Sequence, residues 1–199
     1  MYRTYLIAAL VIAACSQAPA ADEELQAKIK QLEDRVAQLE AALEPFLQQQ
    51  RVAAMRERAR ARMRKDLEVY SQVQLQEIEQ LYQVANRKWR SEEGKKSLEQ
   101  LVEKYDKANR TGCALLYLGR MSEGDEQIQY LTRAVKDYSD CCYGDGVQVG
   151  AYARFVLAER YRADGENDKA DKLIKELKQD YADAIDHGAR PLLATKDNF

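Results

Sequence analysis

The sequence has little of the chemistry on which most active sites depend. It contains one histidine, His187, among 199 residues. A single histidine excludes a pair of histidine ligands for zinc, and neither a glycine-rich phosphate loop nor a G-x-S-x-G turn is present. His187 follows a helical pattern and precedes a Gly and Pro turn, which predicts a cap or a surface residue. We therefore expect no catalytic residue, no cofactor and no metal, and a protein that is not an enzyme.

The chain also has few prolines and glycines, and its net charge is small. The chain has 3 prolines, 9 glycines and a formal charge of -2, with 46% hydrophobic and 32% charged residues. This balance is typical of soluble, largely helical proteins and gives no sign of a nucleic-acid partner. After residue 25 no apolar run reaches the roughly 20 residues that a membrane-spanning helix needs. The composition predicts an all-α fold.

The N-terminus carries the most specific motif. An apolar run, Tyr5 to Ala14, is too short to cross a bilayer and stops at Cys15. The sequence Ile-Ala-Ala-Cys that ends at Cys15 resembles the lipobox of bacterial lipoproteins. That resemblance implies a signal peptide at residues 1–14, a lipid on Cys15 and a short tether at residues 15–24.

The resemblance also implies a location. The residue after the cysteine is Ser16 and not aspartate. In this respect the chain resembles the enterobacterial lipoproteins that are sorted to the outer membrane. We therefore expect a chain anchored in the bacterial outer membrane and facing the periplasm, with the inner membrane left open. An ordinary secretory signal cut near SQAPAA, which discards Cys15, is the alternative.

Residues 25–47 have the apolar spacing of a coiled coil. The spacings alternate between four and three at Leu25, Ile29, Leu32, Val36, Leu39, Leu43 and Phe46. In a parallel assembly Lys28 and Arg35 at g would face Glu33 and Glu40 at e of the partner helix. We therefore predict a parallel homo-oligomer, either a dimer or a trimer. A single amphipathic helix that lies on its own C-terminal domain is the alternative.

The next segment, residues 48–66, is rich in arginine and is called the basic segment here. It contains RVAAMRERARARMRK, in which arginine occupies every second position from 56 to 64. On a helix such arginines surround the axis, which predicts a solvated helical linker. Electrostatic contact with cell-wall polymer or anionic lipid is the alternative.

A repeat fills residues 67–199. Three helical patterns end in a tyrosine followed by a turn, at Tyr105, Tyr138 and Tyr181, with separations of 33 and 43 residues. A period near 34 residues with helix-turn-helix character is typical of tetratricopeptide repeats. The last unit resembles that family most closely, through Leu157, Ala158, Tyr161, Gly165, Ala170 and Ile174. The resemblance implies a superhelix of about three helical hairpins.

Together the lipobox, the coiled coil and the repeats resemble the periplasmic Tol-Pal-associated proteins that coordinate cell division. The repeat lipoprotein of the outer-membrane β-barrel assembly machinery is a second relative by architecture, but it lacks the coiled coil. The resemblance implies a scaffold that recruits an envelope protein through the groove of the repeats. Carried onto this chain, the family's groove positions are Leu116, Arg120, Tyr152, Phe155, Glu159 and Arg162.

Three cysteines remain beyond Cys15. In the repeat register Cys113 begins one helix of the middle unit, and Cys141 and Cys142 follow the other, so a hairpin would bring them together. We predict a disulfide from Cys113 to Cys141 or to Cys142, with the YGDG that follows placed in an insertion loop. A structural lipoprotein that binds through the basic segment, and a thiol-redox protein that uses the paired cysteines, are the alternative functions.

Overall fold

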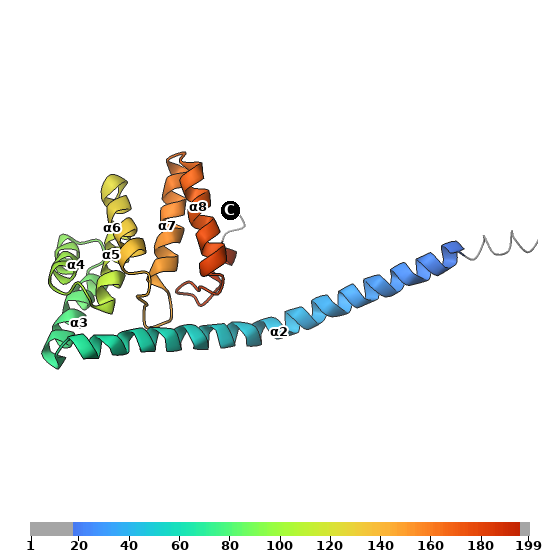
Figure 1. The fold of residues 1–199 in the computed structure, drawn as a ribbon, viewed down its shortest axis with the longest axis horizontal. Helices are drawn as coiled ribbons and strands as arrows, with labels where there is room; N and C mark the ends of the chain where they lie inside the picture. The colour runs from blue at the N-terminus through green and yellow to red at the C-terminus, as the bar shows by residue number, and fades with distance from the viewer. Residues whose placement is uncertain (1–17, 196–199) are drawn as a thin grey trace, which may run out of the picture. The chain divides into compact units, whose positions relative to one another are not determined.

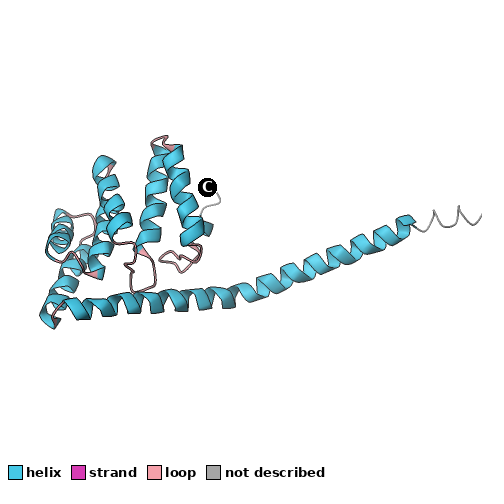
Figure 2. Ribbon diagram, in the orientation of Figure 1, coloured by secondary structure: helices cyan, strands magenta, loops and turns pink. Residues whose placement is uncertain are grey.

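The computed structural model describes residues 18–195, and within them it is all-helical, as the composition predicts. Figure 2 shows α-helices joined by loops, and no strand occurs in this range. The chain divides into two compact units, Met1–Gln48 and Gln49–Phe199. The lipobox and Cys15 fall outside the described residues. Between residues 18 and 195 no helix is long and apolar enough to span a membrane.

The first unit consists of the N-terminal part of helix α2 (Ala18–Val69). The seven apolar residues that define the predicted seam, Leu25 to Phe46 at alternating spacings of four and three, are exposed by 47% to 62%. Pro45 lies inside the helix without ending it. The predicted seam is therefore an uncovered apolar stripe on a continuous helix.

The second unit is built from three successive helix pairs, which Figure 1 shows side by side. Each helix packs against the next one along the chain, and α5 also contacts α3 and α7. The first pair is α3 (Gln72–Arg87) with α4 (Glu92–Lys104), the second α5 (Asn109–Met121) with α6 (Gly124–Asp137), and the third α7 (Val149–Ala163) with α8 (Asn167–Asp180). The middle pair therefore has neighbours on both sides.

The second helix of each pair ends in the same way, at the tyrosines that mark the sequence repeat. The backbone N–H groups of Tyr105, Tyr138 and Tyr181 donate to the carbonyl four residues earlier, at 3.0, 3.2 and 3.0 Å. The carbonyl of each tyrosine then accepts the N–H three residues later, at 3.1, 3.1 and 3.0 Å. The three tyrosines thus mark one repeated helix end.

Two loops of the same design follow the second and third pairs. We call residues 141–149 the first loop and residues 184–192 the second loop; the offset is 43 residues. Tyr143 N–H donates to the Val147 carbonyl at 2.8 Å, and Asp186 N–H donates to the Arg190 carbonyl at 2.9 Å. The residue before each acceptor has a positive φ, 103° at Gly146 and 61° at Ala189. The predicted insertion loop is thus a structural element that occurs twice.

From Gln49 onward the basic segment belongs to the second unit, and one side of it is buried there, so it is not the solvated linker that the sequence predicts. Its buried stripe comprises Met55, Ala59, Arg62 and Asp66, at spacings of four, three and four. Other arginines of the segment, including Arg60 and Arg64, remain exposed. Because half of the buried stripe is charged, hydrophobic periodicity could not reveal it.

The stripe meets the first loop and the start of α5. A Cβ built on Gly146 would lie 2.8 Å from Met55 Cβ and 3.0 Å from the Met55 carbonyl carbon. Only glycine allows the loop backbone to approach the helix this closely. The position of the first loop on α2 is therefore fixed by backbone contact.

Candidate functional site

The second unit has a hollow of about 320 Å³ between α3, α5 and the two loops. We call this hollow the aromatic groove. Its lining residues are Tyr82, Asn86, Arg110, Tyr117, Arg120, Tyr143, Gly144, Asp145 and His187. Three tyrosines, two arginines and a histidine thus line one hollow.

Ring contacts connect the walls of the groove. Trp89, just after α3, meets Tyr117 of α5 edge to face at 4.6 Å between ring centroids. On the opposite side His187 packs on Tyr143 at 4.8 Å and on Tyr152 of α7 at 5.6 Å. Such contacts hold the rings in fixed orientations, so the groove is largely preformed.

The floor is neutral and hydrogen-bonded. Tyr143 is buried, and its hydroxyl donates to the carbonyl oxygen of Cys113 at 3.1 Å. Burial raises the pKa of Tyr143 and of Tyr82 well above the usual value for a phenol. Both hydroxyls therefore stay protonated at physiological pH, and the charge of the groove comes from its rim.

The charged groups of the rim differ in their pairing. Arg110 donates to both carboxylate oxygens of Glu79, at 2.8 and 3.1 Å. His187 Nδ1 lies 2.7 Å from the Asp145 carboxylate, so it links the second loop to the first. Arg120 is exposed and has no carboxylate partner among residues 18–195. Arg120 is thus the cation of this groove that is left without an opposite charge.

The structure brings only some of the predicted groove residues together. Arg120 lines the groove, and the Tyr152 ring lies beneath its guanidinium, 5.6 Å from Cζ to the ring centroid. Leu116 and Phe155 are core residues, exposed by 0% and 6%, which corrects their assignment to the partner surface. Helix α5, which carries Leu116, is covered by α3, α4, α6 and α7. The family's groove position at Leu116 is therefore buried in this chain.

The remaining two predicted residues lie elsewhere on α7. Glu159 and Arg162 are half-buried and do not line the groove, and Arg162 forms an ion pair with Asp171 of α8 at 3.1 Å. Sequence reasoning also missed Trp89 and His187. A lone tryptophan next to a helix end was the available signal for the first.

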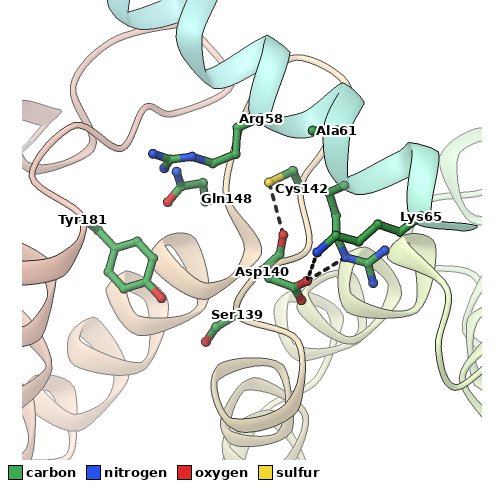
Figure 3. A pocket seen from close by; sticks show the side chains of 9 residues that line it. Arg58, Ala61, Lys65, Ser139, Asp140, Cys142, Gln148 and Tyr181 are labelled. Atoms are coloured by element: carbon green, nitrogen blue, oxygen red, sulfur yellow. Dashed lines mark hydrogen bonds and ion pairs between the residues drawn. The ribbon is translucent and has the colours of Figure 1, made fainter.

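A second hollow of about 300 Å³ lies between α2 and the first loop. Figure 3 shows Lys65 reaching from α2 toward Asp140, and Arg58 extending from α2 beside Gln148 of the first loop. The cations here have partners, because Arg62 Nε lies 2.9 Å from Asp140 and Arg58 lies 3.6 Å from Asp183. The ion pairs around this hollow therefore hold α2 against the segments that follow α6 and α8.

The three described cysteines are buried free thiols. The structure contains no bridge from Cys113 to Cys141 or Cys142; instead Cys113 Sγ lies 3.6 Å from the Cys142 carbonyl oxygen. Burial raises the pKa of Cys142 to about 11 and that of Cys141 to about 12. Protonated thiols are poor nucleophiles, so this geometry does not favour thiol-redox chemistry.

Metal ligands are not assembled in the described part of the chain. Within residues 18–195 no group of three or more His, Cys, Asp and Glu side chains is placed to hold a metal ion. Comparisons with protein-family models, with curated proteins and with solved structures give no match. The groove and the exposed stripe of α2 are the features of the described chain that bear on function.

Proposed function

We propose that the protein is a lipid-anchored, non-enzymatic scaffold of the bacterial cell envelope that holds a segment of a partner protein in the aromatic groove. The observation that carries the proposal is the combination of preformed rings with an exposed, unpaired Arg120. Tryptophan, tyrosine and arginine contribute most of the binding energy at many protein interfaces. A hollow of this size accepts a few side chains of a partner.

The stacked helix pairs support a tetratricopeptide-like superhelix. In such arrays the first helix of each pair lines the concave binding face. Tyr82 on α3, with Tyr117 and Arg120 on α5, line the groove from first helices, and Tyr152 on α7 lies beside it. The shared tyrosine ending of the three pairs adds to the likeness.

The exposed stripe of α2 supports a parallel homo-oligomer. Seven apolar side chains that are half exposed in one helix are covered when equivalent helices associate. Oligomerisation places several grooves side by side and raises their effective concentration for a partner with more than one binding segment.

Anchoring through Cys15 would hold such an oligomer at a membrane. The lipobox resemblance and the serine after Cys15 support the outer membrane, facing the periplasm, as does the architectural resemblance to the Tol-Pal-associated coordinators. Replacing Cys15 by serine should move the protein from the membrane fraction to the soluble fraction. Retention of the Cys15→Ser chain in the membrane would contradict the anchor.

A photo-crosslinking residue at position 86 tests the scaffold in intact cells and leaves Arg120 in place. Asn86 is exposed and lines the groove, whereas Arg133 is an exposed arginine on α6 whose guanidinium lies over the ring of Tyr138. We expect a discrete adduct with one envelope protein from position 86 and none from position 133. Equal adducts from both positions, or none from either, would contradict partner binding in the groove.

Exposed arginines support a second candidate, a structural lipoprotein that contacts cell wall or anionic lipid through the basic segment. Arg60 and Arg64 face solvent, although both pair with Glu57, at 3.4 and 3.0 Å. Replacing Arg56, Arg60 and Arg64 by glutamine leaves the buried Arg62 in place, so the fold is kept. Loss of co-sedimentation with murein or with anionic vesicles would favour this candidate over the scaffold.

A further inference from the structure

We propose that the aromatic groove takes an acidic segment of the partner protein, with a side-chain carboxylate at Arg120 and a neighbouring apolar side chain against Trp89. This inference rests on the proposed function, because it names the chemistry of the segment that the groove would hold. It follows from the charges of the rim, from the setting of Arg120 and from the exposure of Trp89.

The balance of charges at the rim leaves a positive surplus. Arg110 pairs with Glu79, and Asp145, beside His187, is the other carboxylate there, so Arg90, Arg110 and Arg120 outnumber the carboxylates. Arg120 and Arg90 form no ion pair with any residue between 18 and 195. A ligand that matches this rim therefore brings a negative group to the side of the groove where these two arginines lie.

The setting of Arg120 suits recognition of a carboxylate. Its guanidinium carbon lies 5.9 Å from the Trp89 ring centroid and 5.6 Å from the Tyr152 ring centroid. Contacts with two rings restrict the side chain before a ligand arrives, which lowers the entropy cost of binding. The N–H groups of a guanidinium can donate two parallel hydrogen bonds to one carboxylate.

Trp89 supplies the apolar part of the site. It is 41% exposed, although one edge contact with Tyr117 already fixes its ring. The guanidinium of Arg90 lies 5.6 Å from the same ring. An apolar side chain placed here would bury exposed indole surface next to the two cations, and the burial would strengthen the nearby ion pairs.

A sugar ring and an anionic lipid surface fit the groove less well than an acidic peptide does. A neutral sugar ring could stack on Trp89, but it would bring no negative group to Arg120 and Arg90, which lie beside that ring. A hollow of about 320 Å³ behind Arg120 is concave, whereas a lipid surface is broad and flat. A protruding peptide side chain matches the hollow better than either.

The test uses a random ten-residue phage-displayed peptide library selected on the full chain in detergent. We expect the selected peptides to be enriched in aspartate or glutamate beside an aromatic or aliphatic residue. Their affinity can be measured from the fluorescence of Trp89, the single tryptophan of the chain. Arg120→Gln should weaken binding by about tenfold or more, and binding should weaken as salt is raised. Arg133→Gln, the matched control on α6, should leave the affinity unchanged.

The outcomes separate this inference from the proposed function. Peptides without acidic enrichment that lose affinity in Tyr117→Ala but not in Arg120→Gln would overturn the acidic segment and leave groove binding intact. Failure to select any peptide that competes at the groove would overturn both. A third outcome is that no peptide is selected, but phosphatidylglycerol vesicles change the Trp89 fluorescence and Arg120→Gln abolishes that change. This outcome would assign the groove to lipid and overturn the inference.

Discussion

Asp66 on α2 caps the N-terminus of α5: its carboxylate accepts the backbone N–H of Asn109 at 2.9 and 3.2 Å. The N-cap residue of α5, Ala108, has no side-chain group that could do this. Asp66 also accepts a hydrogen bond from Arg62 at 2.8 Å, and both side chains are about nine-tenths buried. The end of α2 is therefore an integral part of the helical domain.

Replacing Asp66 by asparagine should destabilise the domain strongly. The change removes one of the two carboxylates that pair with Arg62, the buried one, and weakens the cap of α5; loss of one partner of a buried ion pair costs about 3 kcal/mol. The free energy of unfolding can be measured by urea titration followed through Trp89 fluorescence. Asp183→Asn is the matched control, because Asp183 pairs with Arg58 at 3.6 Å and both side chains are about half exposed. The control should change the stability by less than about 0.5 kcal/mol.

Replacing Gly146 by alanine should loosen the contact between the first loop and α2. Gly146 has a φ of 103°, and an added Cβ would meet Met55 at 2.8 Å. Gly165→Ala is the control, since Gly165 has a φ of 78° but nothing within 4 Å of the added Cβ. We expect about 1 kcal/mol of destabilisation at 165 from the backbone conformation alone. At 146 the clash should add about 2 kcal/mol more, and equal losses at both sites would contradict the close contact.

Replacing Leu39 by aspartate should disrupt the predicted oligomer. Leu39 is a d residue of the seam and is 62% exposed in a single chain, so a partner helix would have to bury the introduced charge. Sedimentation equilibrium should show a shift from dimer or trimer to monomer. Ala41→Asp, at the outward f position of the same helix, should leave the mass unchanged. A monomeric parent chain would contradict the coiled coil directly.

The thiols should react slowly, and with an unusual dependence on pH. Because burial raises the pKa of Cys142 to about 11, its thiolate fraction should still increase about tenfold between pH 9 and pH 10. An ordinary cysteine, with a pKa near ~8.5, would already level off in this range. Alkylation followed by mass spectrometry measures the rate at each cysteine, and Cys113, exposed by 0%, should react most slowly. In denaturant the three described cysteines should all be alkylated; a count of one would show that the bridge predicted from the sequence does form.

The sequence was informative where residues act through local spacing. The tyrosine endings depend on helix-end geometry within a few residues, and Tyr105, Tyr138 and Tyr181 do end their helices as predicted. The helical state of residues 25–47 follows equally from local periodicity. Both are short-range features, so a single sequence contains them in full.

The sequence was less informative where contacts are long-range. The buried stripe of the basic segment includes Arg62, whose partners Asp66 and Asp140 satisfy its charge only in the folded chain. The sequence alone does not distinguish a surface position from a core position for Leu116 or for Phe155. The packing of α5 and α7 decides it, and it buries both side chains. His187 reaches Asp145 across 42 residues of sequence, a pairing that no motif indicates.

The two loops have the same design, so the helix pair between them could be duplicated. Leu192 occupies the place in the second loop that Val149 occupies in the first, and Val149 starts α7 while Leu192 starts a 3-10 helix. The 43 residues from Val149 to Pro191 are therefore a self-contained module with matching ends. A second copy inserted after Pro191 should fold as an additional helix pair and lengthen the array by one unit. The first valine of the copy would then take the place of Leu192 beside Ala184.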